Sequence, residues 1–173
     1  PTHRVAVVGI GGLGHLALQF LNKWGCEVTA LSSNLSKAEE AKAFGAHRVC
    51  SSTDKAELKK LYGYFDFILV TVNQSLDWHA YTKMLNKKGR LHVVGAVLEP
   101  MPVSVMALMD AQRSVSSSPV GSPATLVTML DFAARHGIQP LVEVFPMSQV
   151  NAAIEHLESG KARYRVVLKA DDF

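Results

Sequence analysis

The chain has 173 residues, of which 48% are hydrophobic, and this is enough to bury the core of one domain of ordinary size. Its 18 basic and 15 acidic residues are well mixed and give a net charge of +3, so the sequence offers no case for nucleic-acid binding. No run of about 18 apolar residues predicts a membrane span. Cys26 and Cys50 lack the spacing of a zinc site or of a disulfide framework, so we expect free thiols and a cytoplasmic protein.

The first informative stretch is a strand, a glycine turn and a helix in direct succession. Arg4–Val8 is apolar enough for one buried strand, and apolar residues recur at helical spacing beyond the turn. Between them, Gly9, Gly11 and Gly14 have the spacing G-x-G-x-x-G. In dinucleotide-binding folds the first glycine allows a sharp turn, the second lets the backbone approach a diphosphate, and the third lets the helix pack closely on the sheet. The stretch therefore predicts a dinucleotide at the start of this helix.

The chain continues with strands and helices in regular alternation. Further strands are predicted at Glu27–Leu31, Arg48–Cys50, Phe65–Val72, Arg90–Val94 and Val115–Ser118. Helices are predicted over about 36–44, 54–61, 77–85, 105–110 and 123–136, with a turn at 86–89. This alternation indicates an α/β fold with a doubly wound parallel sheet of about six strands, a Rossmann fold.

The end of the second predicted strand carries hydroxyl groups and one cation in place of a carboxylate. NAD-binding folds usually have Asp or Glu about 20 residues after the glycines, where it binds the ribose hydroxyls. The corresponding position is Ser32, 18 residues after the last glycine (32 − 14 = 18), followed by Ser33 and Lys37. A carboxylate would repel a 2′-phosphate, whereas hydroxyls and an ammonium bind it, so the pattern favours NADP over NAD. Ser36 is also spaced to cap the next helix, with Glu39 as its capping-box partner.

Several stretches together resemble the zinc-dependent medium-chain alcohol dehydrogenases. They are VVGIGGLGHLALQFLNKWGCEVTALS, SKAEEAKAFGA, SPVGSPATLVTMLDFAARHGI and ARYRVVL. Within this family the sequence is most similar to the NADP-dependent cinnamyl alcohol dehydrogenases and their bacterial aldehyde reductase relatives. The resemblance spans the chain from Arg4 to about Lys169. It implies the NADP-binding domain of an enzyme that interconverts alcohols and aldehydes by hydride transfer.

The resemblance also implies which residues contact NADP. Gly9, Gly11, Gly12, Leu13 and Gly14 match the diphosphate turn, and Ser32, Ser33 and Lys37 match the group that holds the 2′-phosphate. Thr71 and Val72 match positions beside the adenosine and ribose, and Gly95 and Val97 match positions near the nicotinamide. Ser118 and Gly121 match an edge that meets the carboxamide, and Arg165 matches an arginine near the diphosphate.

Two departures from the family pattern change what is expected of this chain. Where the family usually has Gly-Ser, the chain has Ser117 and Ser118, so the side chain of Ser117 is expected to crowd the approach to the nicotinamide. Family members hold a catalytic zinc on Cys and His ligands, and a structural zinc on four Cys, in a preceding domain, and none of these motifs is present. We therefore expect no metal site and no catalytic residue here, and a chain cut from a longer enzyme.

Some features allow a second interpretation. His15, at the start of the first helix, is either a phosphate contact or a packing residue. Asp66 and Asp77 are expected in turn and cap roles rather than in acid–base catalysis. A different class of function, a stand-alone nucleotide-sensing module without catalysis, would use the same first strand and turn. The family-like stretches after Gly95 argue against that alternative.

The tail and one edge of the sheet carry expectations about assembly. Residues 1–140 are expected to form the NADP-binding domain, whereas residues 141–173, by resemblance, return to the absent catalytic domain. We expect strands at Leu141–Phe145 and Arg165–Lys169 to pair with each other or with a second copy, which would displace Arg165 from the diphosphate. A helix over 148–159 should cover them through Val150, Ile154 and Leu157. The strand at 115–120 is expected to pair with its twin in a homodimer, as in the family.

Overall fold

The computed structural model describes residues 1–170, and the chain forms two compact units. The first is Pro1–Ile138, and the second begins at Gln139. The division lies two residues before the boundary expected from the sequence (140 − 138 = 2). No helix within residues 1–170 is long and apolar enough to cross a membrane.

The first unit is built on one parallel sheet of six strands in the order β3-β2-β1-β4-β5-β6. The strands are β1 (Arg4–Val8), β2 (Glu27–Ser32), β3 (Arg48–Ser51), β4 (Phe65–Val70), β5 (Leu85–Val93) and β6 (Ser114–Ser117). The chain moves outward from β1 to β3 and then returns to lay β4 on the other side of β1, so the strand order reverses between β1 and β4. This confirms the predicted doubly wound sheet, and it places the expected ligand crevice at the carboxyl ends of these two strands.

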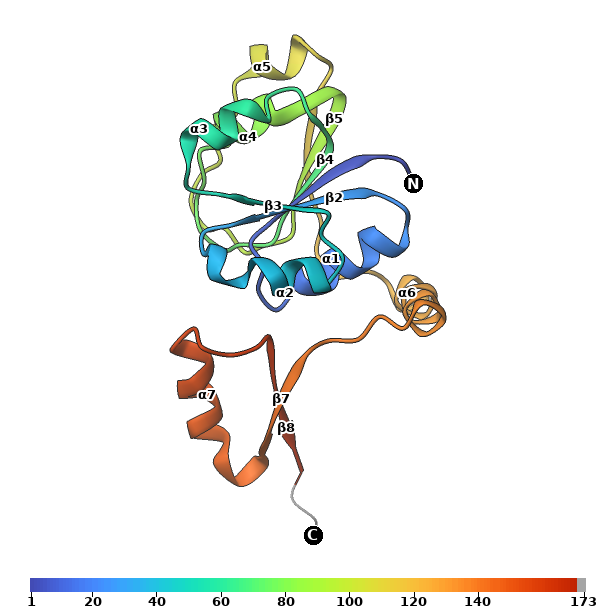
Figure 1. The fold of residues 1–173 in the computed structure, drawn as a ribbon, viewed down its shortest axis with the longest axis vertical. Coiled ribbons are helices and arrows are strands. Elements are labelled where there is room, and N and C mark those ends of the chain that lie inside the picture. The colour runs from blue at the N-terminus through green and yellow to red at the C-terminus, as the bar shows by residue number, and fades with distance from the viewer. Residues whose placement is uncertain (171–173) are drawn as a thin grey trace. The chain divides into compact units, whose positions relative to one another are not determined.

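Helices cover both faces of this sheet. Figure 1 shows α1 and α2 on one side and α3 and α4 on the other. The helices of this unit are α1 (Gly14–Lys23), α2 (Ala38–Ala43), α3 (Lys55–Lys60), α4 (Trp78–Met84), α5 (Val105–Met109) and α6 (Pro123–His136). The largest buried cluster joins Phe65, Ile68 and Leu91 of the sheet to Trp78 and Tyr81 of α4. Each of these side chains is at most 2% exposed, so this layer is the packed core of the unit.

One strand begins earlier than the sequence predicts. Leu85 already pairs with Phe65, and the next pair is Phe67 with Arg90, so four residues of β5 bulge between the two pairs. Lys88, within this bulge, has φ +60°, a value that favours a turn. The predicted turn at 86–89 is thus present as an interruption of β5 rather than as the loop before it.

The predicted capping box after β2 is wrong. The side chain of Asn34 accepts a hydrogen bond from the Ser36 N–H at 2.9 Å and caps a 3₁₀ turn, Leu35–Lys37. The α-helix begins only at Ala38, so Ser36 lies inside the turn instead of at its start. An Asx turn at Asn34 and a capping box at Ser36 are alternative structures for this loop. The structure has the Asx turn, whose capping residue lies two residues earlier in the chain (36 − 34 = 2).

The second unit is a strand, a helix and a parallel strand. Strands β7 (Val142–Pro146) and β8 (Arg165–Lys169) pair in register, which is one of the two pairings expected. Helix α7 (Val150–Glu158) connects them after a 3₁₀ turn, Met147–Gln149.

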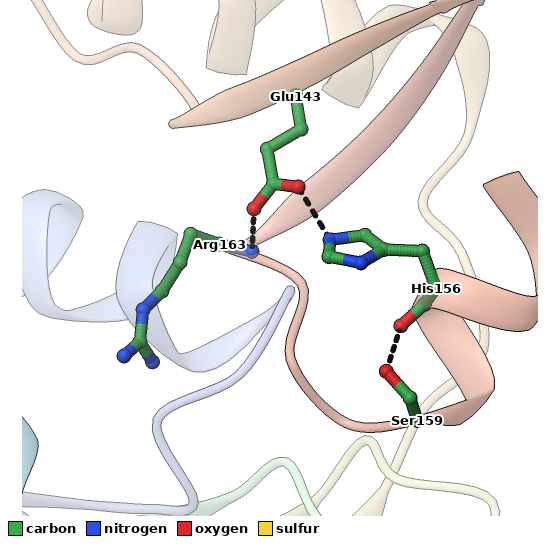
Figure 2. A network of polar contacts seen from close by, with 4 residues as sticks. All are labelled: Glu143, His156, Ser159 and Arg163. Atoms are coloured by element: carbon green, nitrogen blue, oxygen red, sulfur yellow. Dashed lines mark hydrogen bonds and ion pairs between the residues drawn. The ribbon is translucent and has the colours of Figure 1, made fainter.

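The face by which α7 packs differs from the predicted one. Ile154 and Leu157 are 48% and 53% exposed, whereas Ala153 is 1% exposed. Figure 2 shows a polar contact between α7 and the strands: Glu143 of β7 lies between the ring of His156 and the backbone of Arg163. Its carboxylate is 2.5 Å from His156 Nε2 and accepts the Arg163 N–H at 2.6 Å. His156 is three residues after Ala153 and therefore lies on the same face of α7. This face packs on the strands, although Ile154 and Leu157 have larger apolar side chains.

Candidate cofactor-binding site

A cleft of about 620 Å³ opens at the carboxyl ends of β1, β2, β4 and β5. Most of the residues predicted to bind the cofactor line it: Gly9, Gly11, Leu13, Ser32, Ser33, Lys37, Thr71, Val72 and Gly95. They come from four loops far apart in the sequence, and the parallel sheet brings these loops to one edge. This is the crevice in which open α/β sheets bind their ligands.

The three glycines of the turn meet different steric demands. Gly9 has φ +88°, and a Cβ there would stand 2.3 Å from Val72 Cγ1. A Cβ on Gly14 would stand 1.9 Å from the carbonyl oxygen of Gly9, so the helix can start this close to the strand only without a side chain. At Gly11, by contrast, a Cβ would meet no described atom within 4 Å. Protein packing therefore requires the first and third glycines, and it leaves the space above Gly11 open toward the cleft.

The ends of β1, β4 and β5 are fixed against one another below the cleft. The Thr71 hydroxyl lies 2.8 Å from the Gly9 carbonyl and 3.0 Å from the Val8 carbonyl, and it donates to this pair. A Cβ on Gly95 would stand only 1.8 Å from the Val72 carbonyl oxygen. Gly95 thus lets the chain after β5 run directly beside the end of β4.

The loop after β2 brings three of the predicted residues, Ser32, Ser33 and Lys37, to the cleft. Ser32 is 8% exposed, and its hydroxyl donates to the Asn34 carbonyl at 2.9 Å. The same oxygen accepts the Asn34 N–H at 3.2 Å, so Ser32 shapes the turn. Ser33 is exposed and Lys37 is half-buried, and both line the cleft.

Other residues expected at the site have different surroundings. Gly12 is half-buried within the turn, and Val97 packs against the buried cluster. The Ser118 hydroxyl lies 3.0 Å from His92 Nε2, and the Ser117 hydroxyl donates to the Val93 carbonyl at 2.7 Å.

The last two expected residues come from later in the chain. Gly121 is exposed just before α6, and Arg165 lies in the second unit, on β8. These two are not among the residues that line the cleft, and neither are Gly12, Gly14, Val97 and Ser118.

His15 is a packing residue, the commoner of its two interpretations. It is fully buried, its Nδ1 lies 3.0 Å from the Gly11 carbonyl, and its ring meets the Phe44 ring edge-on at 5.3 Å. Asp77 caps α4 by accepting the Ala80 N–H at 3.1 Å, which confirms its expected role.

The structure adds cleft residues that sequence reasoning missed. They are Ile10, Asn34, Asn73, Gln74, Val94 and Ala96. Asn73 and Gln74 follow β4 directly, and polar residues just beyond a buried strand of a parallel sheet are a usable signal for such a site. Ile10 and Ala96 carry no chemical signal of their own, since only the turn geometry brings them to the cleft.

The described residues contain no arrangement suited to zinc. Within residues 1–170, no three His, Cys, Asp or Glu side chains gather where they could hold a metal ion. The residues present therefore do not fit the zinc of the family that the sequence resembles.

Comparison with known proteins gives the same family as the residues. Residues 12–135 match the family model described as zinc-binding dehydrogenase. The aldehyde reductase AdhA of Synechocystis sp. is 56% identical over 97% of this chain and 50% of its own length.

Two solved structures extend the match to the fold. The cinnamyl alcohol dehydrogenase of Sorghum bicolor has a TM-score of 0.92 and is 36% identical over all of this chain and 51% of that chain. The enzyme of that class from Helicobacter pylori, solved with NADP(H), has a TM-score of 0.82 and is 30% identical over 96% of this chain and 48% of that chain. The chain spans about half the length of these relatives. With its family model, its fold and its glycine turn in agreement, the chain belongs to the zinc-binding dehydrogenase family.

Proposed function

We propose that this chain is the NADP(H)-binding half of an oxidoreductase that interconverts alcohols and aldehydes. The observation that carries the proposal is the open space above Gly11, at the start of α1 and inside a cleft of about 620 Å³. A residue that the protein's own packing does not require to be glycine is expected where a diphosphate needs close approach to the backbone. The relative from Helicobacter pylori was solved with NADP(H), which supports the same cofactor here.

Each part of the cleft is assigned one part of the cofactor. The turn through Gly11 and Leu13 holds the diphosphate at the positive end of α1. Ser33 and Lys37 hold the 2′-phosphate, and Thr71, Val72 and Gly95 border the ribose and nicotinamide. When bound, NADP(H) supplies the hydride that is exchanged with the substrate carbon. The residues of this chain bind and orient it.

The glycine pair provides a sharp test of the cleft. Gly11→Ala should leave the unfolding midpoint unchanged, because the new methyl group meets open space, yet it should weaken NADPH binding at least about tenfold. Gly14→Ala should lower the unfolding midpoint, because its methyl group collides with the Gly9 carbonyl. Calorimetric titration and chemical denaturation of both variants measure this. Undiminished NADPH binding by Gly11→Ala would overturn the assignment of the cleft.

Cofactor preference tests the loop after β2. We expect NADPH to bind at least about tenfold tighter than NADH, since one charge-assisted phosphate contact contributes about 1.5–3 kcal/mol. Lys37→Ala should remove much of this preference, and Ser33→Asp should invert it. Lys42→Ala, on the exposed side of α2 where Lys42 pairs with Glu39, is the matched control. Equal affinities of the unmodified chain for the two cofactors would contradict NADP specificity.

The chemistry of the whole enzyme needs groups beyond this chain. By resemblance, the catalytic zinc, its ligands and the substrate pocket belong to another domain, to which the second unit also belongs. We therefore expect the chain alone to show no alcohol-dependent reduction of NADP, with or without added zinc. An absorbance assay at saturating NADP measures this. Turnover by the chain alone would contradict the proposal that catalysis needs groups from another domain.

Assembly is proposed through the open edge of the sheet. Within residues 1–170, strand β6 pairs with β5 alone, and Val120 just beyond it is 82% exposed. Such an edge favours pairing with another strand. We propose that β6 pairs with its twin across a two-fold axis, joining two sheets in a homodimer. Sedimentation should show a dimer, and a proline at Val115 should shift it to monomer. A monomer at all concentrations would contradict the proposal.

A further inference from the structure

A second cavity, of about 440 Å³, lies at the opposite end of the strands from the cofactor cleft. It is lined by the first residues of β1 and β4, by Arg90 of β5 and by the last turn of α1. Its size falls in the range of small-molecule sites. None of the residues assigned to the cofactor lines it, so whatever it holds is separate from NADP(H).

The floor of this cavity is set by strand register. Val5 pairs with Phe67, and Phe67 pairs with Arg90, so the three side chains lie abreast on one face of the sheet. The alternation of side chains turns this face toward α1, whose Leu21 and Trp24 complete the wall. Trp24 is 58% exposed, which is high for a large aromatic side chain. Trp24 stacks on Phe132 at 5.4 Å between ring centroids and Phe67 stacks on His92 at 6.2 Å, and both rings also line the cavity.

The rim carries positive charge. Lys88 and Arg90 both line the cavity and are exposed, and no carboxylate of the described residues lies within ion-pair distance of either. Lys88 is held in place by the bulge of β5, where its N–H donates to the Ala111 carbonyl at 2.7 Å. Two cations on one short stretch, facing an apolar floor, are suited to a carboxylate or a phosphate.

The one acid in the cavity is already engaged. Asp66 accepts the Arg4 N–H at 2.9 Å on one oxygen and the Asn86 side-chain amide at 3.1 Å on the other. Partial burial acts to raise the pKa of Asp66, but these hydrogen bonds and the charges of Arg4 and His3 outweigh it and lower the pKa. Asp66 thus holds the ends of the strands and stays ionised, and its one negative charge is outnumbered by the two cations Lys88 and Arg90 of the lining.

We propose that this cavity binds a small aromatic carboxylate, with its ring between Phe67 and Trp24 and its carboxylate on Arg90 and Lys88. The combination of features selects this class. A free phosphate would leave the apolar wall in water, a neutral aromatic would leave the two cations unpaired, and an ammonium would be repelled by them. Stacking on the rings and pairing with the cations reinforce each other only in an aromatic anion.

The experiment uses the unmodified chain saturated with NADPH, so that the cofactor cleft is filled. Benzoate is titrated while the tryptophan fluorescence and the backbone amide shifts are followed. Cyclohexanecarboxylate, benzyl alcohol and inorganic phosphate are the comparison probes. Benzoate should bind at least about threefold tighter than each of them and should shift the amides of Phe67 and Arg90.

Variants then locate the site. Arg90→Gln should weaken benzoate binding about tenfold, since a charge-assisted contact is lost, while NADPH binding stays unchanged. Lys87→Gln, next to Lys88 but outside the cavity lining, is the matched control and should have no effect. Phe67→Leu keeps the volume apolar and should abolish the preference for benzoate over cyclohexanecarboxylate.

Several results of these titrations would overturn the proposal. These are no benzoate binding, binding that Arg90→Gln leaves unchanged, or phosphate binding as tightly as benzoate. Displacement of benzoate by NADPH would also refute it, because it would place the probe in the cofactor cleft. Failure of NADPH itself to bind would contradict the proposed function and leave this test intact, since the two sites share no residue.

Discussion

The two units of the chain contain the same kinds of element but bury them very differently. In the first, Val5, Ala6, Val7 and Val8 of β1 are at most 1% exposed, because helices cover both faces of the sheet. In the second, Val144 and Val167 lie side by side in register and are 59% and 40% exposed. Parallel strands normally occur with both faces covered. The first unit meets that condition with its own helices, and the second does not.

This difference shows that apolar strands and helices are not sufficient for an independent core. A two-stranded sheet is marginal in water unless further strands or a second layer cover it. In the second unit α7 covers one face of the pair and contributes mainly Ala153 to the buried surface. The uncovered face carries Val142, Val144 and Val167, which form an exposed apolar row.

The largest contrast is expected in hydrogen exchange. Amides of β1 and β4 should exchange only by opening of the whole first unit, whereas those of β7 and β8 should exchange by local opening. The rates should differ on the order of ten-thousandfold, since global stabilities are about 5–15 kcal/mol and marginal elements open at little cost. Exchange followed by NMR or mass spectrometry measures this. Equal protection of the β7 and β1 amides would contradict the difference in stability between the two units.

A matched pair of leucine substitutions gives the next effect. Leu91→Ala removes a fully buried side chain from the first unit and should lower the free energy of unfolding by about 2–5 kcal/mol. Leu157→Ala makes the same change on a side chain that is 53% exposed and should alter it by less than about 0.5 kcal/mol. Denaturant titration of both variants tests this. A large effect of Leu157→Ala would mean that the Leu157 side chain is buried in solution.

A smaller effect is expected from the polar network of the second unit. Glu143→Gln keeps the shape but removes the charge that His156 and the Arg163 N–H share, and it should destabilise the second unit by about 1 kcal/mol. Exchange in β8 should become faster, while NADPH affinity and protection of β1 stay unchanged. Glu155→Gln, on the exposed side of α7, is the control. A loss of protection in β1 would show that the two units unfold together.

The smallest effect concerns acid stability of the first unit. The pKa of Asp66 is lowered in the folded chain, so its ionised form stabilises the fold above the unfolded value of 3.8, and this contribution is lost as the pH falls through the folded pKa. Asp66→Asn should therefore lower the stability at neutral pH slightly, where ionised Asp66 stabilises the fold, and should flatten the pH dependence of stability below about pH 4. Thermal melts between pH 2 and pH 7 measure this. If the stability of Asp66→Asn falls below about pH 4 as steeply as that of the unmodified chain, other carboxyl groups determine the loss of stability in acid.

Most of the first unit could be predicted because its signals are local and agree with one another. The G-x-G-x-x-G turn, the buried run Phe65–Val70 and Gly137, which ends α6 with φ +64°, each specify backbone directly. The early start of β5 could not be predicted, since Leu85 joins the sheet through a bulge that depends on its partner strand. The same holds for cleft residues such as Ala96, which have no chemistry of their own.

The misses in the loop after β2 and in α7 have a common cause. In both, a short polar contact decided the geometry against a stronger sequence pattern. Asn34 displaced the capping box of Ser36, and His156 with Glu143 turned α7 away from the face of Ile154 and Leu157. Side-chain hydrogen bonds of this kind depend on distances that spacing along the chain does not reveal.

The hydroxyl of Thr71 has a consequence for the thermodynamics of cofactor binding. Because it holds the Val8 and Gly9 carbonyls against the end of β4, the turn is already ordered before any ligand arrives. A turn that is ordered in advance loses little conformational entropy when a diphosphate binds, so more of the interaction energy remains as affinity. On the proposed function, cofactor affinity would depend in part on a side chain that follows a different strand from the glycines it supports.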